Sequence, residues 1–447
     1  MNETPVTPDN PVDPTAETAA ESNPGSNEGV SNGGGAKAKP AGPTEVGVHD
    51  LRNFITPRIF VAATRMDDGK TTTCVGLFAA LQRYFTNIGY IKPVGQRFVH
   101  VEGEKIDEDS VLINETYRVR SPLKAMSPIA VEPDFTRKYL AGGNRDDLHR
   151  RVQFAFDEAS WEKDYIIIEG TGHAGVGSVF DLSNALVAKL LHSKVVIVSQ
   201  GGIGKPIDEI ALNLALFEKH GVEVIGAILN KVIPEKMEAH TEFAARGLER
   251  MGLPLLGVVP LHQELRKPTL NQVCHQIRGE FLAGADLKRR RVSKVIIGAM
   301  APARVVRHLQ PGAVVITPGD RDDLVHALLQ VETSQPGSLS GVVLTGDLSL
   351  PQSLLDMLEQ RCSLPIISSK YDIYAIASAI NHMQVKTEVG DRDKISLIQE
   401  LIHQNVQVEK IIQLTGGKLR RPEDVLAERE MADGGNDAST LPEVIQL

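Results

Sequence analysis

Cysteine is scarce in this 447-residue chain, where it occurs only as Cys74, Cys274 and Cys362. The three positions have no metal-ligand spacing, and each falls within an apolar stretch, so we expect buried free thiols in a reducing compartment. The N-terminal residues MNETPVTPDN lack the basic and apolar segments of a secretory signal. No apolar run approaches the roughly 20 residues of a membrane span. The expected location is the cytoplasm.

Basic residues are outnumbered by acidic ones, 48 to 57, which gives a formal net charge of −9. A phosphate backbone or an anionic membrane would be repelled over most of such a surface, so neither nucleic acid nor a membrane is an expected partner. Part of the deficit lies in residues 1–50, which carry eight acidic and two basic side chains. The basic run KRRR at 288–291 is interpreted as a solvated linker, with nucleic-acid contact as the alternative.

Large apolar side chains are rare in the first 55 residues, which are rich in Pro, Glu, Asn, Ser and Gly. Such a segment cannot bury enough surface to offset the entropy lost on ordering. Residues 1–55 are therefore predicted to form a disordered tail. The rest of the chain is long enough for about two domains.

From residue 59 onward, short β-branched runs alternate with stretches of helical spacing. The runs lie at 59–63, 88–92, 165–169, 194–199, 224–229 and 255–260. Continuous apolar strands that alternate with helices predict an α/β fold with a parallel sheet covered by helices on both faces. Most of these strands end in polar or glycine-containing turns. In an open α/β sheet such turns meet in one crevice outside the carboxyl ends of the strands.

A second alternating block follows the basic run, with expected strands at 294–300, 313–320, 341–347 and 364–369. It predicts a smaller α/β domain. The predicted division is a tail over 1–55, a first domain over 56–270, a connector over 271–293, a second domain over 294–390, and a helical segment with a flexible tail over 391–447.

The stretch TRMDDGKTTT at 64–73 resembles a phosphate-binding loop between a buried strand and an apolar helix. Gly69, Lys70 and Thr71 fit the end of the pattern G-x-x-x-x-G-K-[ST], but Thr64 stands at the opening glycine. Backbone N–H groups in such a loop surround phosphate oxygens, and the lysine adds a point charge. The alternative is an ordinary strand–helix turn. Two aspartates inside the loop must point outward or contribute to metal binding.

Oxygen ligands for magnesium follow two of the expected strands. A nucleoside triphosphate arrives with Mg²⁺, which prefers a hydroxyl and one or two carboxylates. Thr71 is the natural hydroxyl, and Glu169 stands at the tip of the strand YIIIE. The cluster IDEDS offers Asp107, Glu108 and Asp109, although acidic clusters in loops are commonly solvated. The sequence therefore predicts ATP and Mg²⁺ as cofactors.

Taken in order, VAATRMDDGKTT, IKPVG, IIIEGTG, GAILNKV and PLLGVVP resemble the dethiobiotin synthetase and cobyrinic acid a,c-diamide synthase branch of phosphate-loop proteins. The resemblance covers roughly residues 57–262. It is strongest to the N-terminal domain of long phosphate acetyltransferases. The family often opens its loop with Gly-Thr, which aligns Ala63 with the glycine and Thr64 with the threonine.

The resemblance implies a role for each matching residue. Lys70 and Lys92 would be catalytic, and Asn230 would read the adenine ring. The magnesium ligands would be Thr71, Asp109 and Glu169. The implied nucleotide-binding residues are Thr64, Asp68, Gly69, Lys70, Thr71, Thr72 and Asn230.

Two departures bear on the acceptor pocket of the true synthetases. Gly95, Gln96 and Arg97 replace small residues that include a serine, and His173 replaces a glycine. A pocket for diaminopelargonic acid is therefore not expected. A surface or packing role is the simplest interpretation of His173.

The second block resembles the DRTGG domain, through Asp320 and Arg321 in PGDRDD and Thr345 and Gly346 in LTGD, with Asp347 at a second glycine. The resemblance implies a non-catalytic, self-associating module that senses a small molecule. The four matching residues would line a regulatory pocket, or else form only tight turns. A homo-oligomer is the expected assembly.

Three hypotheses follow. The first is a Mg-ATP-binding protein with a regulatory DRTGG domain, acting as a slow ATPase or as a nucleotide-sensing partner of a metabolic enzyme in acetyl-phosphate or cofactor metabolism. The second is an ATP-dependent ligase that activates a carboxyl or carbamate group. The third is a non-binding assembly scaffold. Phosphate acetyltransferase activity is not expected, because the catalytic domain of that family has no counterpart in these residues.

Overall fold

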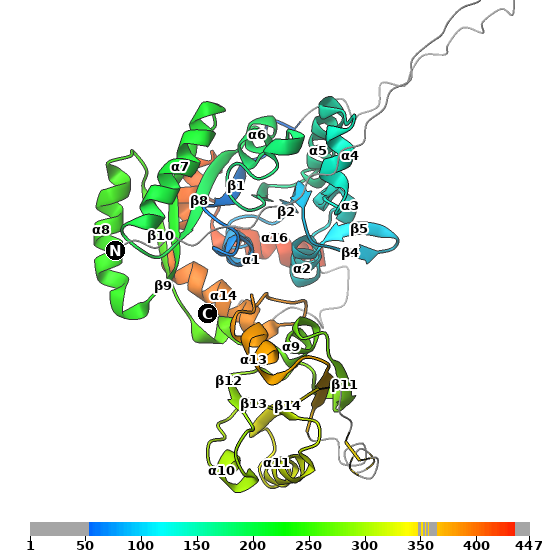
Figure 1. The fold of residues 1–447 in the computed structure, drawn as a ribbon. Helices are drawn as coiled ribbons and strands as arrows, with labels where there is room; N and C mark the ends of the chain where they lie inside the picture. The colour runs from blue at the N-terminus through cyan, green and yellow to red at the C-terminus, as the bar shows by residue number, and fades with distance from the viewer. Residues whose placement is uncertain (1–52, 347–349, 352–353, 355, 357–363, 434–447) are drawn as a thin grey trace, which may run out of the picture. The chain divides into compact units, whose positions relative to one another are not determined.

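The computed structural model describes residues 53–346, 350–351, 354, 356 and 364–433 (Figure 1). Cys362, Asp347 and nearly all of the tail predicted over 1–55 lie outside these residues. Cys74 and Cys274 are buried free thiols, as predicted. Within the described ranges, no helix combines the length and the apolar character needed to cross a membrane.

Six parallel strands form the first sheet, in the order β10-β9-β8-β1-β7-β2. The strands are β1 (Arg58–Ala63), β2 (Ile88–Ile91), β7 (Tyr165–Glu169), β8 (Lys194–Gln200), β9 (Val224–Val232) and β10 (Leu255–Pro260). All six expected runs form strands, which confirms the predicted parallel sheet. Every residue of β1 and β7 is buried, because helices cover both faces and leave no face to solvent.

Two buried apolar clusters lie on opposite faces of this sheet. One face is covered by α1 (Lys70–Leu81), α2 (Glu108–Tyr117), α14 (Arg392–Asn405) and α15 (Val408–Leu414). The other face is covered by α5 (Arg145–Ala159), α6 (Asn184–Leu190), α7 (Lys205–Lys219) and α8 (Met237–Glu249). The helices α14 and α15 come from a part of the sequence far beyond the first domain (Figure 1).

Short elements fill the chain between β2 and β7. They are the parallel pair β3 (Val94–Gly95) and β6 (Ile129–Ala130), the hairpin β4 (Phe98–Val101) and β5 (Glu104–Asp107), and the helices α3 (Leu123–Met126) and α4 (Phe135–Leu140). The hairpin ends at Asp107, whose carboxylate caps α2 by accepting from the backbone N–H of Asp109. This cap fixes the acidic cluster at the start of α2.

The second sheet has the order β11-β15-β14-β13-β12, in which only β11 is antiparallel to its neighbour. Its strands are β11 (Glu280–Ala283), β12 (Lys294–Ile297), β13 (Ala313–Pro318), β14 (Leu339–Thr345) and β15 (Ile366–Ser369). The helices α9 (Leu270–Gln276) and α13 (Ile373–Asn381) pack on one face, and α10 (Pro302–Val306) and α11 (Asp322–Ser334) on the other. The predicted smaller α/β domain is confirmed.

Residues 271–293, predicted to be a connector, contribute most of α9 and all of β11 to this second domain. The strand β11 is only four residues long, so it left no clear periodicity in the sequence. The basic run is not simply solvated. Arg290 donates to the fully buried carboxylate of Glu332 over 2.8 Å and to the carbonyl oxygen of Leu339 over 2.9 Å. Its interpretation as a solvated linker was therefore wrong at Arg290.

The last described element is α16 (Pro422–Asp433). Helical structure thus extends further along the chain than the sequence suggested. Thr86, which follows α1, donates to the carboxylate of Glu428 on this helix over 2.9 Å. Arg429 also donates to the carbonyl oxygen of Phe85 over 2.8 Å.

Candidate functional site

The loop between β1 and α1 ends in a glycine that no other residue could replace. Gly69 is the N-cap of α1 and adopts a left-handed conformation with φ 104°. A Cβ at this position would overlap the side-chain amide of Asn230. No side chain caps α1, and its first turn holds no acidic residue. The N–H groups of that turn are thus free to bind an anion, which the helix dipole also favours.

Asp68 braces this loop from inside. Its Oδ2 atom accepts from the hydroxyl of Thr64 over 2.7 Å and from the backbone N–H of Arg65 over 2.8 Å. Its backbone carbonyl accepts from Asn230 Nδ2 over 2.9 Å. Asp68 is fully buried, whereas Asp67 is exposed with φ 66°. The two aspartates therefore differ: one holds the loop together and the other points outward.

Lys70 begins α1 and is itself nearly buried. Its ammonium donates to the carbonyl oxygen of Arg65 over 3.4 Å, at the limit of a hydrogen bond. Burial lowers the pKa of Lys70, and the carboxylate of Glu169 acts in the opposite direction. Because this hydrogen bond is weak, the charged ammonium of Lys70 can instead donate to a phosphate oxygen.

Thr71 and Glu169 meet at the centre of the site. The Thr71 hydroxyl donates to Glu169 Oε1 over 2.8 Å, and the Tyr90 hydroxyl donates to Glu169 Oε2 over 2.8 Å. Glu169 ends β7 and is fully buried, and burial raises the pKa of its carboxyl group. The hydroxyl and the carboxylate predicted to bind magnesium are therefore in direct contact.

Lys92 lies among three carboxylates. Its ammonium nitrogen forms ion pairs with Asp109 and, over 3.0 Å, with Asp107, and it lies 3.9 Å from Glu169 Oε1. Burial by itself would lower the pKa of Lys92, but the surrounding carboxylates outweigh it and raise that pKa. Burial also raises the pKa of Asp107, whose Oδ2 atom is buried without a hydrogen-bond partner among the residues that the structure describes.

The charges in this centre nearly balance. Asp107, Asp109 and Glu169 contribute three negative charges and Lys70 and Lys92 two positive charges, which leaves one negative charge when all are ionised. Among the residues that the structure describes, no group of three His, Cys, Asp or Glu side chains could hold a metal ion. A magnesium ion here would therefore need the Thr71 hydroxyl and the phosphate oxygens of the nucleotide with which it binds.

Asn230, at the carboxyl end of β9, supports the phosphate loop. Its Nδ2 donates to the backbone of Asp68, and its Oδ1 accepts from the backbone N–H of Lys231 over 2.8 Å. Both halves of the amide therefore have partners within the protein. Thr72 lies half-buried in the first turn of α1, next to the residues that form the centre.

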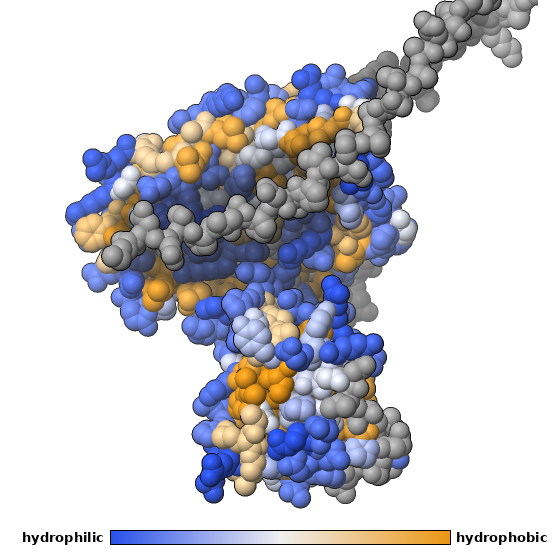
Figure 2. All heavy atoms as spheres, in the orientation of Figure 1, coloured by the Kyte–Doolittle hydropathy of each residue, from blue (hydrophilic) through white to orange (hydrophobic). Residues whose placement is uncertain are grey.

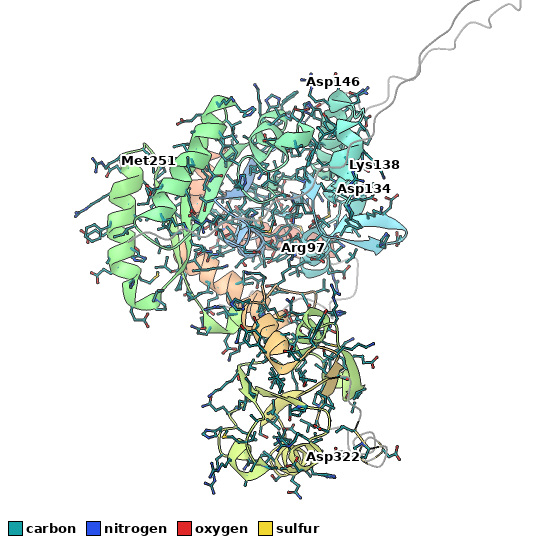
Figure 3. The ribbon with its side chains drawn as sticks, in the orientation of Figure 1. Arg97, Asp134, Lys138, Asp146, Met251 and Asp322 are labelled. Carbon is teal, nitrogen blue, oxygen red and sulfur yellow. The ribbon has the colours of Figure 1, made fainter. Side chains whose placement is uncertain are left out.

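The two departures from the synthetase pattern lie on neighbouring loops. Arg97, labelled in Figure 3, is exposed. Its carbonyl oxygen accepts from the backbone N–H of Glu108 at the start of α2 over 3.1 Å. His173 is exposed, and its Nδ1 accepts from the backbone N–H of Gly175 over 3.2 Å. Figure 2 shows a hollowed, hydrophilic surface where α1 lies in Figure 1. The polar character of this surface suits a charged ligand.

The sequence did not single out Tyr90 or Ser199 as functional. Ser199 at the end of β8 lies 3.0 Å from the Thr64 hydroxyl and thereby joins the loop to the next strand. Tyr90 and Ser199 belong to apolar strands, and only the tertiary fold shows which strand residues face the site. Asp107 was noticed only as a member of an acidic cluster.

The second domain brings its predicted residues to one edge of its sheet. Pro318 in β13 is paired with Thr345 in β14, and Gly319 N–H donates to the carbonyl oxygen of Thr345 over 3.1 Å. Asp320 is exposed. Arg321 donates to the carbonyl oxygens of Gly298 and Met300 over 3.3 and 3.2 Å and pairs with Asp323 over 2.8 Å.

The two turns are therefore adjacent, with Gly346 in the second of them at φ 88°. The Arg321 guanidinium bonds the loop that follows β12 to these two turns. A pocket lined by these residues remains a prediction.

Two family models match the chain. A model described as AAA domain matches residues 57–269, and a model described as DRTGG domain matches residues 272–383. These matches confirm the predicted P-loop domain followed by a DRTGG domain. The chain thus combines a P-loop NTPase-like domain of the AAA type with a DRTGG domain.

Several curated relatives are phosphate acetyltransferases. The protein from Pseudomonas aeruginosa is 28% identical over 374 residues, which are 80% of this chain and 52% of that protein. The protein from Nitrosomonas europaea is 26% identical over 372 residues, which are 80% of this chain and 51% of that protein. The chain spans about half the length of the curated relatives it matches.

Similarity to solved structures is weaker. The septum site-determining protein MinD from Pyrococcus horikoshii OT3, complexed with Mg-ADP, is 17% identical. The match covers 47% of this chain and 84% of that chain with a TM-score of 0.30. This value is too low to carry an argument about function.

Proposed function

We propose that the first domain binds ATP with Mg²⁺ and that the DRTGG domain regulates this site. The observation that carries the proposal is the 2.8 Å hydrogen bond between the Thr71 hydroxyl and Glu169. Thr71 directly follows Lys70, the lysine of the phosphate loop. A hydroxyl and a carboxylate at this position are the oxygen ligands that Mg²⁺ bound to nucleotide phosphates requires. The uncapped N-terminus of α1 supplies N–H groups for the phosphates.

The residues present fit a magnesium ion, because they offer oxygen atoms and no soft ligand. Thr71, Glu169 and Asp109 would hold the ion, and Lys70 would hold the β- and γ-phosphates. When bound, Mg²⁺ would neutralise phosphate charge. Glu169 already accepts a hydrogen bond from Thr71, and Asp109 already pairs with Lys92. Binding of the ion therefore requires Lys92 to share its carboxylate partners with Mg²⁺ or to release them.

The activity that fits best is slow ATP hydrolysis or nucleotide sensing. The relatives named above are phosphate acetyltransferases, which supports a link to acetyl-phosphate metabolism. On this proposal the protein forms a homo-oligomer and acts on a metabolic enzyme, while a small molecule bound near Arg321 sets the nucleotide affinity.

An ATP-dependent ligase is the second candidate, because Lys92 matches a lysine beside the substrate in true synthetases. Its ammonium is engaged by Asp107 and Asp109, however, which leaves it less available to an acceptor. A ligase would form a mixed phosphoric anhydride and release ADP only when a carboxylate or carbamate acceptor is present. ADP release without an added acceptor supports an ATPase instead.

The test is calorimetric titration of the full chain with ATP and Mg²⁺, alongside Lys70→Ala. A matched control is Lys205→Ala, which removes an exposed lysine from the start of α7. We expect saturable binding in the wild type and the control, and at least a tenfold weaker affinity in Lys70→Ala, about 1.4 kcal/mol. The absence of saturable binding at millimolar nucleotide would contradict the proposal and favour a non-binding scaffold.

A further inference from the structure

The chain returns to the first domain after it leaves the DRTGG domain. Residues 382–415, called the exit arm here, consist of a ten-residue link followed by α14 and α15. The helix α14 lies along α1 (Figure 1). The buried apolar side chains of the exit arm belong to the same cluster as those of α1: Ile395, Ile398, Leu401, Ile402, Val406, Val408, Ile411 and Ile412. The exit arm is therefore part of the core of the nucleotide-binding domain.

The contact between α1 and α14 is unusually close. Gly76 lies in the middle of α1, and a Cβ there would overlap the side chain of Ile402. Gly76 follows Lys70 by six residues, or about 9 Å along a helix axis. Ile402 therefore packs on the same helix that carries Lys70 at its start.

Other bonds hold the exit arm in place. Gln399 Nε2 donates to the Tyr117 hydroxyl over 3.0 Å, and the Tyr117 ring stacks on Phe78 of α1 at 4.2 Å. Beyond α14, the Gln407 N–H donates to the carbonyl oxygen of Leu256 in β10 over 2.8 Å. The arm is therefore fixed to a helix and to a strand of the first sheet.

The ten-residue link is attached at its other end to the DRTGG domain. Gln272 of α9 donates to the carbonyl oxygen of Lys386 over 2.8 Å. Arg289 donates to the carbonyl oxygen of Gly390 over 3.2 Å, and Arg291 pairs with Asp391 over 2.8 Å. The basic run thus holds the end of the ten-residue link against the DRTGG domain. These bonds restrict how far the link can move relative to that domain.

The same link reaches the acidic cluster. Lys386 Nζ pairs with Glu108 Oε2 over 2.9 Å, and Glu108 stands between the two aspartates that hold Lys92. One short segment therefore contacts the second domain, α2 and, through α14, the helix of the phosphate loop.

We infer that the exit arm couples the DRTGG domain to the phosphate loop, with Ile402 as a positioning residue. Nucleotide binding that shifts α1 shifts α14 and, through the link that departs from α13, restrains α13. Coupling is reciprocal, so a ligand of the DRTGG domain changes nucleotide affinity by the same factor. This inference rests on the proposed nucleotide binding for its trigger, while the mechanical path exists without nucleotide.

Hydrogen exchange of the full chain, read by mass spectrometry with and without Mg-ATP, tests this coupling. We expect Mg-ATP to slow exchange about fivefold or more in peptides from α1, α14 and α13, the lower end of typical coupling. In Ile402→Ala the slowing should persist in α1 and disappear in α13. Leu248→Ala is the matched control, because it opens a cavity of similar size on the opposite face of the sheet and should retain the slowing in α13.

Equal slowing of α13 in Ile402→Ala and in the wild type would overturn the inference, as would slowing that ends at α1 in the wild type. If Ile402→Ala does not fold, Ile402→Val is used instead. It removes one methyl group and should reduce, without abolishing, the slowing of exchange in α13 by Mg-ATP. If Mg-ATP changes nothing in α1, the proposed function fails by itself. The inference is then judged without nucleotide: Ile402→Ala must speed exchange in α13 relative to Leu248→Ala, and unchanged exchange there would overturn it.

Discussion

The ammonium nitrogen of Lys92 lies 3.0 Å from Asp107 Oδ1, at the heart of the candidate site. Both side chains are almost fully buried. Asp107 also accepts from the backbone of Asp109, so one carboxylate fixes both the lysine and the start of α2. The free protein therefore keeps this lysine neutralised by internal carboxylates.

Lys92→Met should destabilise the protein, because it leaves the carboxylates of Asp107 and Asp109 buried without their cation. We expect the free energy of unfolding in urea at pH 7 to fall by about 3 kcal/mol. The deficit should shrink as the pH is lowered, since burial already raises the pKa of Asp107 and protonation removes its charge. Lys105→Met, which breaks an exposed pair with Glu132, should change the stability far less, because solvent screens that pair. Similar losses in both variants would argue against a buried cluster that depends on Lys92 for its charge balance.

Thr71→Val should weaken the effect of Mg²⁺ on ATP binding by about tenfold or more, because it removes a hydroxyl that binds a charged partner. The measurement is the ratio of the ATP dissociation constants in EDTA and in Mg²⁺. Thr73→Val is a matched control on the same helix, since its buried hydroxyl has no hydrogen-bond partner within the described part of the chain. An unchanged ratio in Thr71→Val would remove Thr71 from the metal site.

Gly69→Ala should abolish nucleotide binding and lower the unfolding temperature. The new Cβ would overlap the Asn230 amide, and φ 104° is strained for any L side chain. Gly175→Ala in a neighbouring turn is the control, because a Cβ there would make ordinary contacts at 3.5 Å. Calorimetry and thermal unfolding of both variants provide the comparison. Normal binding by Gly69→Ala would show that the loop does not need its left-handed residue.

Lys394→Met should stabilise the protein at pH 7, by about 1–2 kcal/mol after allowance for screening. Burial lowers the pKa of Lys394 to about 8, with Arg291 acting in the same direction and Asp391, Glu388 and Glu264 opposing it. Its Nζ atom is buried, and no described residue offers it a hydrogen-bond partner.

The sign of the pH dependence follows from this lowered pKa. Between about pH 8 and 10.5 the unfolded chain binds more protons than the folded chain, so the stability of the wild type should rise with pH across that window. The gain from Lys394→Met should therefore be largest below pH 8 and should vanish near pH 10.5. Urea unfolding at pH 7, 8, 9 and 10 measures it, with the exposed Lys410→Met as control. A gain independent of pH would contradict the argument.

Much of the fold could be predicted because its signals are local. Six buried strands such as β1 and β7 consist of consecutive apolar residues, and each sits between helices of clear spacing. The four-residue β11 has too few residues to show a period, and its place beside β15 depends on contacts about 85 residues away. The role of Arg290 was missed for the same reason, since its partner Glu332 lies on α11, 42 residues further along the chain.

By itself, the sequence determined where the strands, the phosphate loop and the candidate ligands Lys70, Thr71 and Glu169 occur. Short-range constraints suffice for this, because a strand–glycine–lysine–helix order is written in consecutive residues. Only the tertiary structure decided that Asp68 turns inward, that Asp107 binds Lys92, and that Ile402 packs on Gly76. Asp68 is also held by a bond from Asn230 on β9. This bond and the Lys92–Asp107 and Gly76–Ile402 contacts join segments whose approach depends on how the whole core packs, and local patterns carry no information about that packing.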